Sequence, residues 1–197
     1  MGIFNRNKNA DTFDAPTQAV DNISGDYTID PSHSRLGFSA RHAMVTTVRG
    51  SFGVFEGTAQ VDTTTPANSS VNLTIQTASI DTGAEDRDGH LKSADFFDAE
   101  TYPTITFVST EVERDGSDWN VTGDLTIKDV TKPISIAFEE TGSAVDPFGN
   151  TRIGFEGATT LNRKDWGLTW NAALETGGVL VSEKIKLDFD VSAIKNA

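Results

Sequence analysis

The sequence predicts an all-β fold, a single domain of about eight antiparallel strands with one or two short helices. Two observations carry this prediction: apolar residues recur at every second position along most of the chain, and turn-forming clusters separate these segments. Strands with one apolar and one polar face are typical of antiparallel sheets, whereas parallel strands covered by helices read as continuous apolar runs. Such strands either close into a barrel or pair into a sandwich.

The alternating pattern begins near Tyr27 and continues almost to the end of the chain. It recurs in seven segments, which are 35–41, 71–76, 104–107, 120–127, 134–139, 152–156 and 184–191. An eighth segment, 52–61, shifts its phase between Val54 and Phe55, which predicts a β-bulge.

Turn signals separate these segments. They are "TTTPANSS" at 63–70, "RDGSD" at 114–118 and "DPFGN" at 146–150. Two stretches break the strand pattern. One is "HAMVTTVRG" at 42–50, and the other is 85–103, which predicts a short helix followed by a loop, with a strand restarting at the end of it.

Length and charge limit the function classes. The chain has 197 residues, no cysteine and a net charge of −13. Without cysteine, disulfides, thiolate zinc sites and thiol nucleophiles are excluded. The acidity disfavours binding to nucleic acids and strong electrostatic docking on anionic membranes. No segment approaches the ~20 apolar residues that span a bilayer, so no integral membrane segment is expected.

The first 25 residues are polar and without periodicity, which predicts a disordered N-terminal tail at 1–25 ahead of one barrel domain at 26–197. This stretch has no uninterrupted apolar run of the kind found in secretory signals, and Arg6 breaks the myristoylation pattern. A cytoplasmic location is therefore the expectation.

Motifs for catalysis or metal binding are weak. The spacing of His33, His42 and His90 fits no short metal motif. "DRDG" at 86–89 lacks the remaining ligands of a calcium loop, and Asp86 or Asp88 suits a helix N-cap better. No nucleophile elbow, phosphate loop or paired carboxylates in an apolar setting are found. We therefore expect no cofactor, no metal and no enzymatic activity.

The apolar inventory is more informative, because 12 Phe and 3 Trp are spread over the chain. An eight-stranded barrel has an interior that holds either its own side chains or one small ligand. Periodicity alone does not choose between these two states.

Four blocks in order resemble the YceI-like, polyisoprenoid-binding family: "YTIDPSHSRLGFSARHAMVTTVRGSFGVFEGT", "DRDGHLKSADFFDAETYPTITFVST", "VTGDLTIKDVTKPISIAF" and "TTLNRKDWGLTW". The resemblance covers about residues 26–194. It implies a lipocalin-like barrel with a hydrophobic tunnel that binds an isoprenoid chain, such as a polyprenyl pyrophosphate or an isoprenoid quinone. Many relatives carry a secretion signal, which is not detected here.

If the apolar phase of the strands faces inward, it lines the tunnel. The predicted residues around the ligand tail are Phe38, Phe52, Leu73, Ile75, Phe96, Phe97, Ile105, Phe107, Leu125, Phe138, Phe155, Trp166 and Trp170. The predicted contacts to a polar head group are Arg41, His42, Arg49, His90 and Arg163. For His42 and His90, a structural hydrogen bond that pins a loop is an equal alternative.

The expected function is thus to carry or sequester a polyisoprenoid, as a monomer or homodimer. One alternative is an enzyme that acts on a lipid-like substrate, with His42 and a nearby carboxylate as acid and base. The other is a stress or envelope accessory protein with a filled barrel and no ligand.

Overall fold

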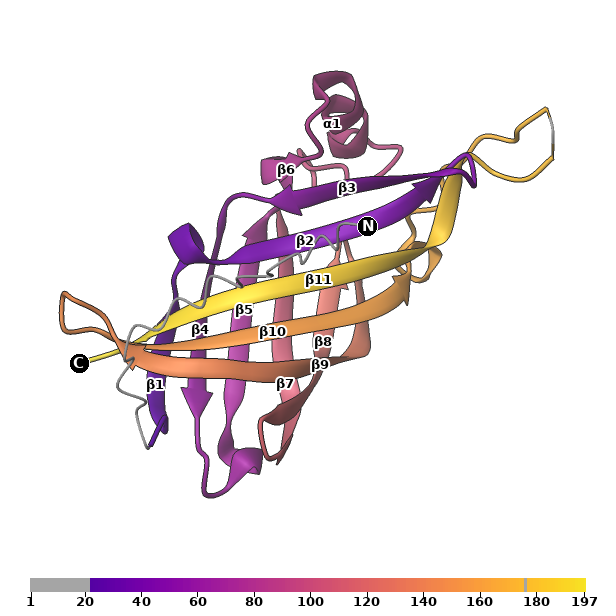
Figure 1. Ribbon diagram of the computed structural model, residues 1–197. Helices are drawn as coiled ribbons and strands as arrows, with labels where there is room; N and C mark the ends of the chain where they lie inside the picture. The colour runs from indigo at the N-terminus through magenta and orange to yellow at the C-terminus, as the bar shows by residue number, and fades with distance from the viewer. Residues whose placement is uncertain (1–21, 176) are drawn as a thin grey trace, which may run out of the picture.

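The computed structural model describes residues 22–175 and 177–197. Eight strands form a ring in which every strand is antiparallel to its neighbours. In order around the ring they are β1 (Gly25–Ile29), β4 (Phe55–Val61), β5 (Ser70–Gln76), β7 (Thr104–Asp115), β8 (Asp118–Ile127), β9 (Val130–Val145), β10 (Thr151–Asn162) and β11 (Val181–Lys195). The ring closes where β1 pairs with β11 (Figure 1). The all-β prediction is confirmed, and of its two forms the chain adopts the barrel.

Three more strands extend the wall at one end: β2 (Arg35–His42), β3 (Thr46–Phe52) and the short β6 (Ile80–Asp81). After a 3-10 turn, η1 (Pro31–His33), β2 continues along the strand β11 that β1 also pairs with. The β1–β2 and β3–β4 segments therefore each serve as one long, interrupted strand. This explains why about eight strands can be counted in the sequence.

The predicted bulge between Val54 and Phe55 is wrong, because strand β3 ends at Phe52 and a separate strand, β4, begins at Phe55. Before the break, β3 pairs with β2 and β6, and after it β4 pairs with β1 and β5. Gly53 and Val54 lie between two sets of strand partners, so the change of phase marks a change of partners. A local pattern cannot distinguish this from an inserted residue.

The stretch "HAMVTTVRG" was expected to break the strand pattern, but it forms the β2–β3 hairpin. Its turn places Ala43 and Met44 at φ values of 48° and 63°, and the Val45 N–H donates to the His42 carbonyl at 3.1 Å. Asn and Gly usually occupy the two central positions of a hairpin β-turn when both have positive φ. Here Ala and Met occupy the positions, so the usual sequence signal is missing.

The α-helix α1 (Glu85–Lys92) lies over one end of the barrel (Figure 1). It ends before Phe96 and Phe97, which belong to the turn that follows rather than to the helix. The N-cap is Ala84, not Asp86 or Asp88; the Asp88 carboxylate instead accepts the Thr82 N–H at 2.9 Å. Two further 3-10 turns, η2 (Pro66–Asn68) and η3 (Thr77–Ser79), flank β5.

The predicted turns at 63–70, 114–118 and 146–150 all lie at junctions between strands. At the N-terminal side, packing begins at Ile23, which is 4% exposed and accepts a hydrogen bond from the Tyr27 hydroxyl at 2.7 Å. Ile23 therefore packs against the barrel two residues before β1 begins, and the boundary at 26 stays a prediction. The rest of the predicted tail, residues 1–21, lies outside the described residues.

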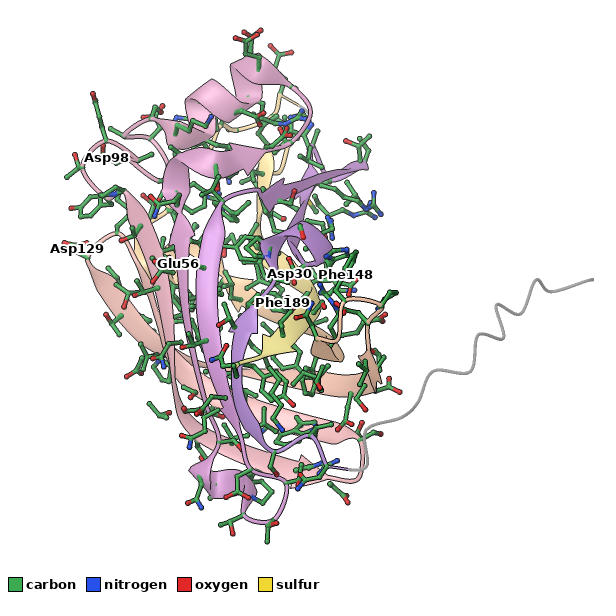
Figure 2. All side chains as sticks on the ribbon, turned by 90° about the vertical axis from the view of Figure 1, so that its left-hand side faces the viewer. Asp30, Glu56, Asp98, Asp129, Phe148 and Phe189 are labelled. Carbon is green, nitrogen blue, oxygen red and sulfur yellow. The ribbon has the colours of Figure 1, made fainter. Side chains whose placement is uncertain are left out.

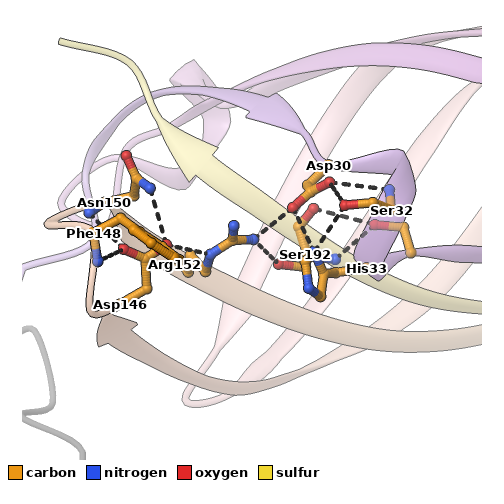
Figure 3. A network of polar contacts seen from close by, with 9 residues as sticks. Asp30, Ser32, His33, Asp146, Phe148, Asn150, Arg152 and Ser192 are labelled. Atoms are coloured by element: carbon orange, nitrogen blue, oxygen red, sulfur yellow. Dashed lines mark hydrogen bonds and ion pairs between the residues drawn. The ribbon is translucent and has the colours of Figure 1, made fainter.

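A polar network ties the bend between β1 and β2 to the β9–β10 turn (Figure 3). The Arg152 guanidinium donates to Asp30 at 2.6 Å and to Asp146 at 2.9 Å. Hydrogen bonds from Ser32 and Arg152 hold the pKa of Asp30 well below its usual range. Bonds from Arg152 and Asn150 do the same for the pKa of Asp146, and the two carboxylates raise the pKa of Arg152.

Candidate functional site

The barrel encloses a cavity of about 370 Å³, lined by the inner faces of its strands. This volume lies in the lower part of the range of 300–1,000 Å³ that is usual for small-molecule sites. Phe189, labelled in Figure 2, is one of the aromatic residues on its wall. The interior is hollow, so a fully packed barrel does not describe this protein.

A second, larger hollow of about 1120 Å³ lies over the outside of β7 to β11. It is open, and exposed carboxylates such as Glu113, Glu139 and Glu156 line it. A shallow acidic surface leaves a hydrocarbon in water and repels an anionic head group. We therefore regard the enclosed cavity as the candidate site, although it is the smaller of the two.

Glycines help to keep the cavity open in an interior rich in phenylalanine. Phe38 lies opposite Gly50 across β2 and β3, and Phe138 lies opposite Gly157 across β9 and β10. A Cβ atom added at Gly50 would lie 2.5 Å from the Phe38 ring, and one at Gly157 would also clash with Phe138. Because the rings occupy the space over these glycines, they lie along the wall instead of filling the lumen.

Twelve of the thirteen predicted tail residues line this cavity. They are Phe38, Phe52, Leu73, Ile75, Phe96, Phe97, Ile105, Phe107, Leu125, Phe138, Phe155 and Trp170. The exception is Trp166, which is 3% exposed in the 3-10 turn η4 (Arg163–Trp166), where its indole N–H donates to the Leu125 carbonyl at 3.0 Å. Trp166 therefore holds the backbone of the lining residue Leu125 without facing the cavity itself. Whether the twelve touch a ligand stays a prediction.

Basic side chains gather at one end of the cavity. Arg41 and His42 come from the end of β2, Arg87 and His90 from α1, and Arg163 from the start of η4. Ser182 brings two of them together, because its hydroxyl accepts the Arg41 N–H at 3.0 Å while its carbonyl accepts the Arg163 Nε–H at 2.9 Å. The Phe96 ring contacts both His90 and the Arg163 guanidinium, which places His90 at the same end. Among the described residues, no Asp or Glu lines the cavity, although the chain carries a net charge of −13.

Arg49, the remaining predicted head contact, does not line the cavity. It pairs with Ser39 in the middle of the β2–β3 hairpin and is exposed, because its phase on β3 points outward. Arg87 takes its place in the lining and was missed. A signal for it was present, since Arg87 and His90 are three residues apart and therefore share one face of the predicted helix.

Arg163 is the most deeply buried of these basic residues, with 4% of its surface exposed. Its guanidinium donates to the backbone carbonyls of Leu168, Val181 and Ser182, and no carboxylate forms an ion pair with it within the described chain. The nearby Glu183 is held by Lys164 at 2.5 Å. Burial lowers the pKa of Arg163, yet a guanidinium remains charged at neutral pH. The cavity therefore contains a buried positive charge that no described carboxylate contacts directly, and the nearby Glu183 acts on it only through space.

Three rings close around this end. His90 makes edge-to-face contacts with Trp170 and Phe96, with ring centroids 4.6 Å and 5.1 Å apart. The His90 Nε2 atom also lies 2.8 Å from an Asp95 carboxylate oxygen, outside the cavity lining. His90 thus has the structural bond considered from the sequence, while its ring still borders the cavity.

The two ends of the cavity differ in exposure. At the basic end, Arg41 and Arg87 are exposed and Trp170 is half-buried. At the other end, the lining includes Ile153 at 1% exposure, which belongs to the same buried cluster as the fully buried Tyr27. We therefore take the basic end as the mouth.

The geometry offers little for acid–base or metal chemistry. His42 borders the cavity, but no carboxylate faces it there within the described ranges. His33 lies outside the cavity lining and pairs with Asp30 at 2.8 Å. No cluster of three His, Asp or Glu side chains in residues 22–175 and 177–197 is arranged to hold a metal ion. No described helix has the length and hydropathy needed to cross a bilayer.

Comparison with known proteins adds to this picture. The YceI-like domain matches residues 27–193. The chain is 40% identical over 148 residues to protein YceI of Escherichia coli O17:K52:H18, covering 74% of this chain and 78% of that protein. It is 39% identical over 149 residues to the UPF0312 protein ECA1782 of Pectobacterium atrosepticum, covering 75% and 78%.

Solved structures agree in fold. BcnA of Burkholderia cenocepacia superposes with a TM-score of 0.73 at 25% identity, covering 83% of this chain and 98% of BcnA. The YCEI protein of Campylobacter jejuni has a TM-score of 0.69 at 30% identity, with coverage of 80% and 90%. A polyisoprenoid binding domain from Saccharophagus degradans has a TM-score of 0.65 at 20% identity, with coverage of 86% and 98%, and this likeness is one of fold alone.

Proposed function

Because the chain belongs to the YceI-like family, we propose that it binds a polyisoprenoid in the barrel cavity and carries or sequesters it without catalysing a reaction. The observation that carries this proposal is the lining: apolar along the length of the barrel, basic at one end, and without a carboxylate in its described part. The description of the Saccharophagus protein as a polyisoprenoid binding domain supports the same ligand class.

The apolar part of the wall suits the tail of such a lipid. Each CH2-sized group removed from water contributes about 0.8 kcal/mol, so one five-carbon isoprene unit contributes up to about 4 kcal/mol. Binding of this kind needs no reactive side chain. It needs walls without unpaired polar groups, and the strands supply these because all their backbone groups point along the sheet.

The basic mouth favours an anionic head group. Arg163 is buried and in contact with no carboxylate of the described chain, and Arg41, His42, Arg87 and His90 line the same cavity. A phosphate or pyrophosphate forms hydrogen bonds with such groups in which donor and acceptor are both charged, whereas the carbonyl of a quinone is a neutral acceptor and gains less from the same donors. We therefore propose a polyprenyl phosphate or pyrophosphate, with an isoprenoid quinone as the competing ligand.

The test is to purify the protein under native conditions, extract the bound lipid and identify it by mass spectrometry. We expect an isoprenoid with a phosphate or pyrophosphate head. Delipidated protein should then take up polyprenyl phosphate more tightly than polyprenol or quinone of equal chain length. Ligand-free protein that takes up none of the three would refute the proposal.

An enzymatic role makes a different prediction for His42. If this residue were an acid or base, His42→Ala would abolish turnover of the lipid while leaving its uptake intact. A carrier with His42 at its mouth shows no turnover in either form. We expect extracted ligand to be chemically unchanged after prolonged incubation with the wild-type protein.

A further inference from the structure

Two apolar side chains stand exposed at the mouth of the cavity. Met44 and Val45 form the tip of the β2–β3 hairpin, with 61% and 75% of their surfaces exposed. The tip adjoins the cavity lining, because the Ala43 N–H donates at 2.7 Å to the carbonyl of Leu180, itself a lining residue. In Figure 1 the hairpin and the loop before β11 extend together from one end of the barrel.

The hairpin carries positive charge in an acidic protein. Residues 41–49 contain Arg41 and Arg49 and no carboxylate, against a net charge of −13 for the whole chain. Both arginines are exposed, and neither forms an ion pair with another described residue. Arg35, further from the tip on β2, is by contrast paired with Asp188.

We propose that this hairpin docks on the surface of a bilayer that contains anionic lipids. Met44 and Val45 enter the interfacial region, where burial of their side chains is favourable, and the exposed Arg41 and Arg49 contact lipid phosphates. Docking in this way brings the basic mouth of the cavity against the lipid from which a ligand is taken or to which it is delivered.

The overall acidity restricts this docking instead of preventing it. At physiological ionic strength the Debye length is about 8 Å, so charges at the tip act on the bilayer with little influence from the distant body. Glu183, which follows Ser182 beside Arg41, is already paired with Lys164. The rest of the surface is repelled by anionic lipid, and this repulsion selects one orientation.

Another exposed apolar side chain, far from the hairpin, offers a control. Phe148, in the β9–β10 turn, is 89% exposed, more than either hairpin residue. It lies beside the Asp30 network (Figures 2 and 3), at the opposite end of β10 from Arg163 and the mouth. If any exposed apolar side chain could mediate docking, Phe148 would contribute to vesicle binding. If the hairpin mediates it, changing Phe148 has no effect.

The test is co-sedimentation of the full chain with vesicles of phosphatidylcholine alone, or of equal parts phosphatidylcholine and phosphatidylglycerol. We expect binding to the anionic vesicles that weakens at ~1 M salt, where the Debye length falls to about 3 Å. In Met44→Asn/Val45→Ser, binding should fall about tenfold or more. Asn is chosen because it tolerates the positive φ at Met44.

Variants that remove one charge, together with the Phe148 control, separate the electrostatic from the apolar contribution to vesicle binding. Arg49→Ser should weaken binding to anionic vesicles about fivefold, while Lys132→Ser, an exposed lysine on β9, should leave it unchanged. Phe148→Ser should also bind like the wild type. Absence of wild-type binding, or an equal loss in Phe148→Ser, would overturn the proposal. So would a wild-type dimer in light scattering that the hairpin variant dissociates.

Docking and ligand binding are tested separately. Met44 and Val45 do not line the cavity, so their double variant should still take up isoprenoid delivered in detergent micelles. Uptake without docking in the wild type refutes the docking proposal and leaves the proposed function standing. Docking without uptake refutes the proposed function alone.

Discussion

At three places on the inner wall, a phenylalanine ring lies over a glycine of the neighbouring strand. Phe38 covers Gly50, Phe138 covers Gly157, and Phe107 reaches Gly123, where an added Cβ would lie 2.5 Å from its ring. All three rings also line the cavity. The size of the lumen therefore depends on residues that have no side chain.

Gly157→Ala tests this dependence. The new methyl group must displace the Phe138 ring, so we expect a loss of about 1–3 kcal/mol in the free energy of unfolding and weaker uptake of isoprenoid. Urea unfolding and a ligand titration measure both quantities. Gly89→Ala is the control, since nothing lies within 4 Å of its added Cβ on α1 and uptake should not change. Unchanged uptake in Gly157→Ala would mean that the rings do not set the lumen.

Arg163 gives a second prediction at this scale. Arg163→Met removes the buried charge, so affinity for polyprenyl phosphate should fall about 10- to 100-fold while affinity for polyprenol stays nearly constant. The variant should also be less stable, because three backbone carbonyls lose their donor. Arg163→Lys, which keeps the charge, should retain most of the preference for phosphate. An equal loss for both lipids would assign Arg163 a structural role only.

At the scale of elements, β1 and β2 depend on the polar network that fastens the bend between them to β10. Asp30 lies at the bend, Arg152 on β10 and Asp146 in the preceding turn. Their side chains are 11% to 24% exposed, so the network is half-buried. Its location suggests that it stabilises the closure of the ring.

This network predicts a pH dependence of stability. The folded-state pKa values of Asp30 and Asp146 lie below the unfolded value of about 3.9, so their contribution is full above that value and is lost as the pH falls through the folded values. We expect an unfolding free energy that is steady from neutral pH to about pH 5 and declines below about pH 4. Urea unfolding across this range measures it.

Arg152→Leu should make that decline shallower and lower the stability at neutral pH, because the two carboxylates lose their shared partner. Lys164→Met removes an exposed pair with Glu183 instead and should have little effect. A wild-type stability profile that Arg152→Leu leaves unchanged would contradict a role for the network in closing the barrel.

For the whole molecule, a hollow interior couples ligand binding to stability. A ligand that binds only the folded barrel stabilises it by about 2.7 kcal/mol at a concentration one hundred times its Kd. For a protein of this size that corresponds to a rise in Tm of about 5–10 °C. We expect delipidated protein to melt lower than protein reloaded with polyprenyl phosphate, as measured by calorimetry. A Tm that no isoprenoid raises would argue against occupancy of the cavity.

The alternation of single strands could be predicted well, because each residue's face depends on its neighbours along the chain. Leu73, Ile105 and Phe155 are examples whose inward phase was evident. Trp166 lies outside the cavity lining, since it belongs to a 3-10 turn where a period of two has no meaning. Arg49 lies outside the lining for the opposite reason: it obeys the strand period, and that period points it outward.

By itself, the sequence determined the class of fold, the inner face of most strands and the resemblance to the YceI-like family. Only the tertiary structure decided that the interior is hollow and that Arg87 joins Arg41, His42, His90 and Arg163 at one end. The physical reason is range. A strand's faces follow from adjacent residues. The charged mouth instead arises where β2, α1 and η4 meet, and the empty lumen arises where phenylalanine side chains lie over glycines of neighbouring strands.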